Sequence, residues 1–159
     1  DGTPVRIPHI GKVIIEDNVE IGAKCTIARG TLSSTIIKNN VKLDDQIHIG
    51  HNCFIGEKTI ITACAEISGS AHIGKKCWIG PNVVLTNATY PKHPTIKQNL
   101  QGVRLRRNSK IGANTTILPG VEVGENSLIG AGSMVTKDIK CNLIVAGNPA
   151  KKIRDIDYI

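Results

Sequence analysis

Large aliphatic residues recur every six positions along most of the chain. If each of them is called position one of a six-residue unit, 18 of 19 such positions carry Ile, Leu or Val. An α-helix would repeat every 3.6 residues, so this period predicts short strands separated by turns. The register consists of Ile15, Ile21, Ile27, Ile37, Leu43, Ile49, Ile55, Ile61, Ile67, Ile73, Ile79, Leu85, Leu105, Ile111, Ile117, Val123, Ile129, Val135 and Cys141.

Two other positions of the unit support the same frame. Position five is small or β-branched, as at Cys53, Ala65 and Thr115, so a large and a small residue alternate toward the interior. Position two is often glycine, which we expect to permit the backbone turn between strands. These glycines are Gly22, Gly50, Gly56, Gly74, Gly80, Gly112, Gly124 and Gly130.

Three units of six make one triangular coil of 18 residues, and stacked coils pair as parallel strands about 4.8 Å apart. The sequence therefore predicts an all-β, single-domain parallel β-helix over residues 1–159. Two insertions interrupt the frame, one of four residues near Leu32 to Ile36 and one of about fourteen between Tyr90 and Arg104. The second contains Pro91 and Pro94, so residues 90–104 should project as a loop, either functional or merely decorative.

The repeat dissolves after Lys140. A terminal coil leaves unpaired backbone, so we expect residues 141–159 to form a short cap over it. A short helix from about Lys151 is a further expectation.

Composition narrows the class of ligand. The net charge is +7 with a pI near 9.3, which suits anionic ligands such as nucleotides or coenzyme A. Nucleic acid is not favoured, because the basic residues form no single run and no aromatic residues are interleaved with them. No apolar stretch approaches the ~18 residues of a membrane span. Five cysteines without CxxC spacing indicate reduced thiols in a cytoplasmic protein.

One column of outward positions contains groups suited to acyl transfer. His51, Gly69 and Asn87 all hold position three and follow one another at intervals of one coil, so they should lie one above another. A base, an approachable backbone N–H and a polar side chain in line can make an acyl-transfer site. The alternative is three unrelated surface residues. A zinc site is not expected, because His48 and His72 fall on different faces.

The N-terminal half resembles the lipid A acylglucosamine N-acyltransferases. The similarity covers RIPHIGKVIIEDNVEIGAKCTIARGTL and DDQIHIGHNCFIGEKTIITACAEISGSAHIG, and the family's catalytic base is the His of IGHN, here His51. The second half, with LTNATYP, SKIGANTTILPGVEVGENSLIGAGSMVTKDI and VAGNPAKKI, resembles nucleotide-sugar N-acetyltransferases that use acetyl-CoA. In some of those enzymes a carboxylate follows the base His, whereas Asn52 stands here.

The resemblance implies a left-handed β-helix that works as a homotrimer. It implies an acetyl-CoA-dependent N-acetyltransferase for a nucleotide-linked amino sugar of a surface polysaccharide such as lipopolysaccharide, without a metal. His51 would take the amine proton, the Gly69 N–H would stabilise the oxyanion, and Asn87 would position the amine or the base. An acyl carrier protein-dependent acyltransferase and a catalytically silent trimeric scaffold remain open.

The same resemblance suggests where the cofactor lies. Ala113 and Ala131 share position three and are one coil apart, so they could line the pantetheine arm of coenzyme A. Lys151, Lys152 and Arg154 could meet its phosphates, although a solvated basic tail is an equal alternative.

Overall fold

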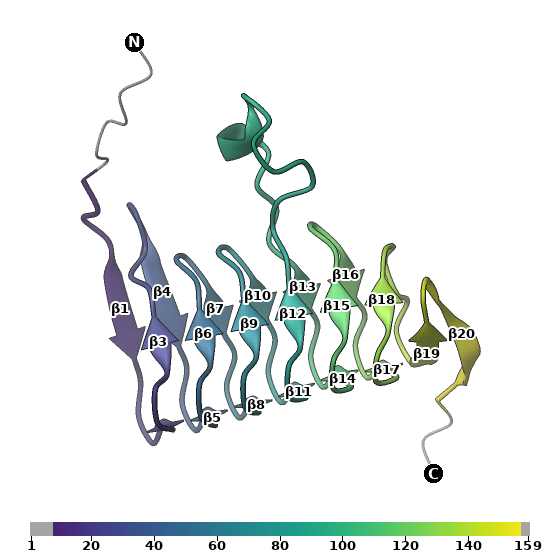
Figure 1. Ribbon diagram of the computed structural model, residues 1–159. Coiled ribbons are helices and arrows are strands. Elements are labelled where there is room, and N and C mark those ends of the chain that lie inside the picture. Colours follow the sequence, from purple (N-terminus) through teal and green to yellow (C-terminus); the bar gives the residue numbers. More distant parts are fainter. Residues whose placement is uncertain (1–7, 157–159) are drawn as a thin grey trace.

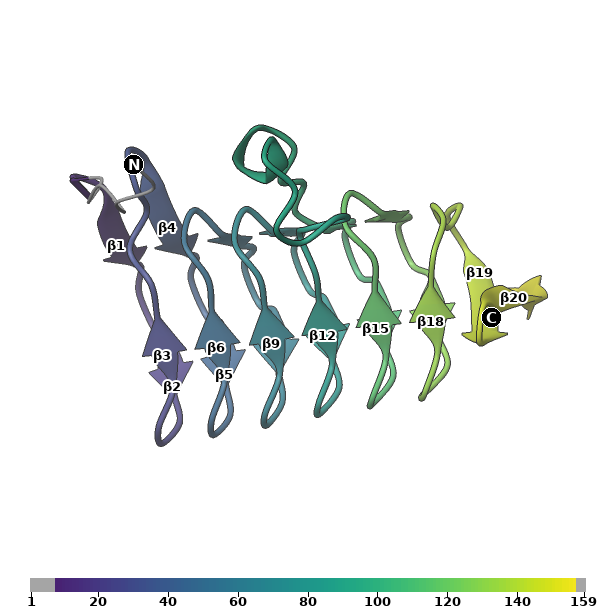
Figure 2. The same cartoon turned by 45° about the horizontal axis from the view of Figure 1, so that its top comes forward.

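A computed structural model describes residues 8–156, which wind into a three-sided parallel β-helix (Figures 1 and 2). We number the three sheets in the order in which the chain enters them. The first sheet contains β1 (Lys12–Ile15), β4 (Ser34–Ile37), β7 (Phe54–Ile55), β10 (His72–Ile73), β13 (Arg104–Leu105) and β16 (Glu122–Val123). The second contains β2 (Glu20–Ile21), β5 (Lys42–Leu43), β8 (Ile60–Ile61), β11 (Trp78–Ile79), β14 (Lys110–Ile111), β17 (Leu128–Ile129), β19 (Leu143–Gly147) and β20 (Ala150–Asp155). The third contains β3 (Thr26–Ile27), β6 (His48–Ile49), β9 (Glu66–Ile67), β12 (Val84–Leu85), β15 (Thr116–Ile117) and β18 (Met134–Val135).

The strand register confirms the predicted coil length and both insertions. Ile55 pairs with Ile73, which is one coil of three six-residue units. Between β1 and β4 the offset is 22, from Lys12 to Ser34, which is a coil plus four residues. Between β10 and β13 it is 32, from His72 to Arg104, which is a coil plus fourteen. The chain is the expected left-handed β-helix, and each insertion leaves the stacking of the coils intact.

The core is the column of position-one side chains. Each of them from Ile37 to Val135 is buried, and the small position-five residues fill the space between. Buried hydroxyl groups at position five donate to backbone carbonyls, as Thr59 Oγ1 does to Gly74 O at 2.9 Å. Among residues 8–156, no buried side-chain nitrogen or oxygen atom is left without a partner.

The expected role of the position-two glycines is wrong. The left-handed backbone lies at position four, with φ of 62° at Asn52 and 65° at Ser70. Asparagine tolerates this conformation better than most residues. Glycine is needed at position two for a different reason: a Cβ on Gly50 would lie 2.5 Å from Gly69 N in the next coil. The glycines therefore permit close stacking, and position four makes the turn.

The C-terminal cap is a β-hairpin instead of a helix. β19 continues the second sheet beside β17, and β20 pairs with β19 in antiparallel fashion. The coil before it is two residues short, because Val123 pairs with Ile139 at an offset of 16. This shortening shifts the register, so Cys141 is exposed and Val145 is the buried residue. The assignment of Cys141 to position one and the helix from Lys151 are both wrong.

The long insertion leaves the solenoid between β12 and β13 and projects from the corner that joins the third sheet to the first (Figures 1 and 2). We call this the loop corner. The loop's one helical segment within the described chain is η1 (Ile96–Gln98), far shorter than the roughly 20 residues that cross a membrane. Hydrogen bonds within the loop, such as Asn99 Nδ2 to Thr95 O at 3.1 Å, hold it together.

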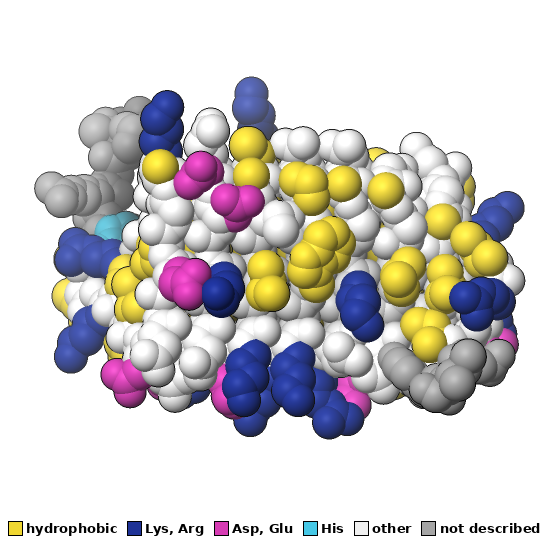
Figure 3. Space-filling model, turned by 90° about the horizontal axis from the view of Figure 1, so that it is seen from below, with side chains coloured by type: hydrophobic (Ala, Val, Ile, Leu, Met, Phe, Trp, Pro, Cys, Tyr) yellow, Lys and Arg dark blue, Asp and Glu magenta, His cyan; other side chains and the backbone are white. Residues whose placement is uncertain are grey.

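The outer face of the second sheet carries exposed apolar side chains. Hydrophobic side chains gather along its middle, with lysines and arginines around them (Figure 3). Ile60 is 41% exposed and Trp78 is 38% exposed, and their strands are neighbours in the sheet. Such a face is typical of a surface that meets a partner.

Candidate functional site

The structure brings His51, Gly69 and Asn87 together at the loop corner. They follow β6, β9 and β12, which are consecutive strands of the third sheet. Ser70 N donates to His51 O at 2.9 Å, and Asn87 Nδ2 donates to Gly69 O at 3.1 Å. The predicted column therefore exists, and one peptide group, Gly69–Ser70, links its two ends.

The His51 imidazole lies over the Gly69 backbone. A Cβ on Gly69 would be 2.9 Å from His51 Nε2 and 3.0 Å from Cε1, so only glycine leaves room for the ring. The other ring nitrogen, Nδ1, lies 2.8 Å from Asn52 Oδ1. The imidazole is thus held on one side and presents Nε2 over bare backbone. This arrangement suits a general base.

Asn87 forms a hydrogen bond with the Gly69 backbone, and in the described chain no hydrogen bond joins its side chain to the His51 ring. In uninterrupted coils the carbonyl of position three accepts from the position-four N–H one coil on, as His51 O does from Ser70 N. At Gly69 O the long loop interrupts the next coil, so no backbone N–H among residues 8–156 takes this place. The side-chain amide of Asn87 donates to Gly69 O instead. Gln101, where the loop returns, donates its N–H to Asn87 O at 3.0 Å. Asn87 therefore supports the column at the point where the coil is interrupted.

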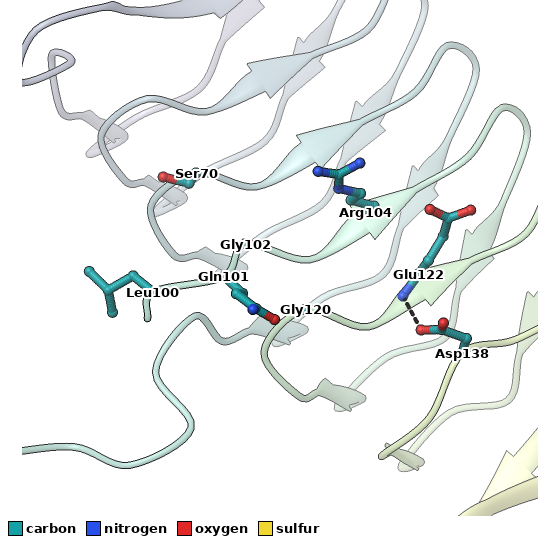
Figure 4. A pocket seen from close by; sticks show the side chains of 8 residues that line it. All are labelled: Ser70, Leu100, Gln101, Gly102, Arg104, Gly120, Glu122 and Asp138. Carbon is teal, nitrogen blue, oxygen red and sulfur yellow. Dashed lines mark hydrogen bonds between the residues drawn. The ribbon is translucent and has the colours of Figure 1, made fainter. Parts of the chain in front are cut away.

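A polar cleft of about 530 Å³ begins at Ser70, the residue that follows Gly69 (Figure 4). It runs along the loop corner onto the first sheet and is lined by Ser70, Leu100, Gln101, Gly102, Arg104, Gly120, Glu122 and Asp138. Gly120 N donates to Gln101 O at 3.0 Å, so the returning loop forms part of its wall. This cleft was not predicted from the sequence, because its lining depends on where the loop returns.

Charges in the cleft are partly neutralised. Arg106 binds Glu122 through two hydrogen bonds of 2.8 Å and holds the pKa of that carboxyl below its usual range. Asp138 Oδ1 accepts the Glu122 N–H at 2.8 Å. Within residues 8–156, the Arg104 guanidinium makes neither a hydrogen bond nor an ion pair. Its planar group is suited to a phosphate or carboxylate of a ligand.

The first sheet also carries an aromatic pair. Phe54 and His72 stack with ring centroids 4.6 Å apart. Partial burial, with smaller contributions from Arg104 and Arg106, lowers the pKa of His72. His72 and His48 stand on different sheets, as the repeat predicts.

The alanine pair lies at a different corner from His51. Ala113 and Ala131 follow β14 and β17, at the corner that joins the second sheet to the third, and Gly132 N donates to Ala113 O at 2.8 Å. We call this the alanine corner. The two corners are opposite edges of the third sheet, so one chain does not bring the alanines to His51.

The basic residues of the cap lie on β20, the outermost strand of the second sheet. Lys151, Lys152 and Arg154 are all exposed. Lys152 pairs with Asp155 at 2.6 Å, and such an exposed pair contributes little to stability. No contact links them to the loop corner in the described chain.

Comparison with protein families identifies the repeat. The model described as hexapeptide repeat of succinyl-transferase matches residues 12–44 and 46–87, and that of bacterial transferase hexapeptide (six repeats) matches residues 102–137. The solved polySia-specific acetyltransferase NeuO is 31% identical with a TM-score of 0.75, over 94% of this chain and 69% of NeuO. The chain belongs to the hexapeptide-repeat transferases.

Two further relatives are named for different acyl-transfer activities. UDP-3-O-acylglucosamine N-acyltransferase of Coxiella burnetii is 54% identical over 69 residues, which are 43% of this chain. This chain spans 20% of the length of that relative. A galactoside acetyltransferase solved in complex with coenzyme A is 28% identical with a TM-score of 0.61, over 89% of this chain and 66% of that one.

Proposed function

We propose that this protein is an acetyl-CoA-dependent N-acetyltransferase that acts on a nucleotide-linked amino sugar in the cytoplasm. The observation that carries the proposal is His51, whose Nε2 lies over the bare backbone of Gly69 at the base of the loop. The solved relatives named as acetyltransferases support acetyl transfer, and the galactoside enzyme's complex supports coenzyme A as the carrier. The five cysteines are free thiols, in keeping with a reducing compartment.

The proposed reaction uses the groups of the loop corner. The amine nitrogen attacks the thioester carbonyl, so a C–N bond forms and the C–S bond breaks. His51 Nε2 takes the proton that the amine loses and passes it to the departing thiolate. The Gly69 N–H stabilises the negative charge that develops on the carbonyl oxygen. Asn87 holds the adjoining Gly69–Ser70 peptide through Gly69 O.

The polar cleft supports a sugar-like, charged acceptor. Ser70 and Gln101 offer hydrogen-bonding groups, and Leu100 offers an apolar surface of the kind a sugar ring packs against. Arg104 is the basic residue in the lining of the cleft, and we propose that it binds a phosphate of the nucleotide. We assign Ala113, Ala131, Lys151, Lys152 and Arg154 to the coenzyme.

The two corners imply a shared site in a homotrimer. His51 and Ala113 lie at opposite edges of the third sheet, so they meet only when the loop corner of one copy faces the alanine corner of another. The exposed apolar residues of the second sheet, next to the alanine corner, favour such contact. Light scattering should give about three times the 17.0 kDa chain mass.

Mixing two inactive variants tests the shared site. Ala113→Glu blocks the alanine corner but should fold, because Asp45 already holds position three there. After unfolding and refolding at equal amounts with His51→Ala, about a quarter of wild-type activity should return, since each mixed trimer carries one intact site. If the refolded mixture stays inactive although both variants form trimers, a site shared between copies is contradicted.

The activity itself is tested with a panel of UDP-, dTDP- and GDP-linked amino sugars and acetyl-CoA. The acetylated product is followed by mass spectrometry, because exposed cysteines would interfere with a thiol reagent. His51→Ala should lower kcat at least about 100-fold. The exposed loop residue His93 gives a matched control, and His93→Ala should keep kcat within a few-fold. A trimeric His51→Ala protein with normal kcat would exclude His51 as the base.

A second candidate is an acyl carrier protein-dependent N-acyltransferase. The 54% identity over 69 residues to the Coxiella burnetii enzyme favours it. The same acceptors tested with acyl carrier protein thioesters separate the two donors. Transfer from the carrier protein and none from acetyl-CoA would replace the first proposal with this one.

A further inference from the structure

The four-residue insertion lies directly beside the His51 column. It falls between β3 and β4, and the loop corner is the corner at which the chain passes between these strands. The next coil brings Asn52, the neighbour of His51, against it. Asn52 is at position four, where the backbone N–H normally donates to the position-three carbonyl one coil below, as Ser70 N does to His51 O.

The insertion changes this pattern at Asn52. Asn52 N donates instead to Thr35 Oγ1 at 2.9 Å, and Thr35 Oγ1 donates to Ala28 O at 2.7 Å. Thr35 is completely buried, so its hydroxyl group is a fixed part of the wall. A side chain of β4, directly after the insertion, thus replaces the missing backbone acceptor and fixes the position of the Asn52 backbone.

The insertion also fixes which way the Asn52 side chain faces. Its Oδ1 accepts the Thr31 N–H at 3.2 Å, and its Nδ2 donates to Ser33 Oγ. The Thr31 N–H can only donate, so a flipped amide would set two donors against each other. The oxygen of the amide must therefore be the atom that faces His51 Nδ1, 2.8 Å away.

The amide orientation determines the tautomer of His51. An amide oxygen only accepts hydrogen bonds, so Nδ1 of the neutral ring must carry the hydrogen. The lone pair is then on Nε2, the nitrogen that lies over Gly69. Unlike a carboxylate, the amide orients the ring without adding a negative charge that would favour its protonated form.

We propose that residues 31–35, which belong to the insertion and the start of β4, form a bracket that sets the tautomer and orientation of the His51 imidazole through Asn52. Ser33 and Thr35 are positioning residues, and Asn52 is the group through which they act. The importance of this bracket for catalysis rests on the proposed function, whereas the tautomer is a property of the protein without substrate.

The tautomer is measured by two-dimensional ¹H–¹⁵N NMR of the histidine side chains, with His51→Ala used to assign the signals. Wild-type protein should show the Nδ1–H form of His51. Asn52→Gly removes the amide without backbone strain, because φ is 62° there, and should move His51 toward the Nε2–H form. Ser33→Ala should do so partially. Ser34→Ala is the matched control and should leave the spectrum unchanged, because the Ser34 hydroxyl group has no hydrogen bond in the described chain.

Kinetics separate positioning from a merely structural effect. Ser33→Ala and Asn52→Gly should lower kcat about tenfold or more with KM for acetyl-CoA nearly unchanged. Asn52→Asp keeps an acceptor at the same place and should restore kcat at pH 8 but not at pH 6, where the added carboxylate favours the protonated ring.

Two results would overturn the bracket: an Nε2–H tautomer in wild type, or an unchanged tautomer in both Asn52→Gly and Ser33→Ala. If the tautomer shifts as expected but no acceptor is acetylated by wild type, the proposed function fails and the bracket stands. If His51→Ala abolishes transfer while Asn52→Gly alters neither tautomer nor kcat, the bracket alone fails.

Discussion

Replacing Gly69 by alanine tests the geometry of the site with a single methyl group. The new Cβ would lie 2.9 Å from His51 Nε2, well inside the 3.4 Å at which ordinary contacts begin. The ring or the backbone must therefore move by roughly half an ångström to restore a normal contact. The backbone is held by hydrogen bonds on both sides of the Gly69–Ser70 peptide, at 2.9 and 3.1 Å. The half-buried imidazole is the softer partner and should be displaced.

The size of the effect follows from this displacement. A misplacement of about 1 Å in a reacting group costs on the order of 100-fold in rate, so a shift of half that or more should lower kcat about 10- to 100-fold. This loss corresponds to roughly 1.4–2.7 kcal/mol in the activation barrier. Stability should change little, because φ of Gly69 is not in the left-handed region and Ala113 holds the same position of its unit. We expect Tm within about 3 °C of wild type.

A double-mutant cycle provides the control. Product formation is measured by mass spectrometry for Gly69→Ala, His51→Ala and the combined variant. Without the ring, only the 3.1 Å approach of the methyl group to His51 O remains, so the double variant should be slower than His51→Ala alone by much less than the loss that Gly69→Ala causes in wild type. Strictly additive losses would refute the reasoning, because they would mean that the methyl group acts independently of the imidazole. Normal kcat in Gly69→Ala would equally refute it.

Three other predictions follow from charge and burial. Arg104→Gln should raise KM for the nucleotide-linked acceptor about tenfold or more, whereas Arg107→Gln, outside the cleft, should not; equal effects in steady-state kinetics would remove Arg104 from the site. The pKa of His72 is lowered by partial burial, so the unfolded chain binds its proton more readily; stability is therefore lost as pH falls below about 6.5. The Tm of His72→Phe relative to that of wild type should therefore rise when the pH is lowered from 7.5 to 5.5. A difference in Tm that is the same at both pH values would contradict this. Burial raises the pKa of Cys53 to about 11, so iodoacetamide at pH 8 should label exposed Cys64 quickly and Cys53 only after unfolding. Equal labelling rates in peptide mass spectra would exclude such burial.

The fold was predictable because one physical requirement is repeated in every coil. Each coil buries one aliphatic residue per face, so the period of six is visible without any structure. The insertions were predictable in length for the same reason, since the frame resumes after each of them. The role of the position-two glycines was predicted wrongly, because the sequence shows that the Cβ is absent but does not show the reason for its absence. At Gly50 the reason is the neighbouring coil, which only coordinates reveal.

The cap lies where this requirement ends. A terminal coil has no next coil to fit, so its residues need not keep the period. The pairing of Val123 with Ile139 shortens the last coil by two residues, and nothing in the hydrophobic pattern distinguishes that from a full unit ending at Cys141. The antiparallel hairpin that follows provides hydrogen-bond partners for the backbone at the end of the coil. The sequence did predict that this end would need a cap.

The candidate site was predictable only as far as it follows the repeat. The column of His51, Gly69 and Asn87 was found from spacing, because residues one coil apart must stack. The contacts that orient it come from places where the repeat is broken: Ser33 acts from one insertion, Thr35 acts from the strand directly after it, and Asn87 acts where the other begins. At each break a side chain replaces a backbone group that the regular coil would have supplied. Insertions beside a conspicuous outward residue are therefore the first places to search for the groups that orient it in any solenoid of this kind.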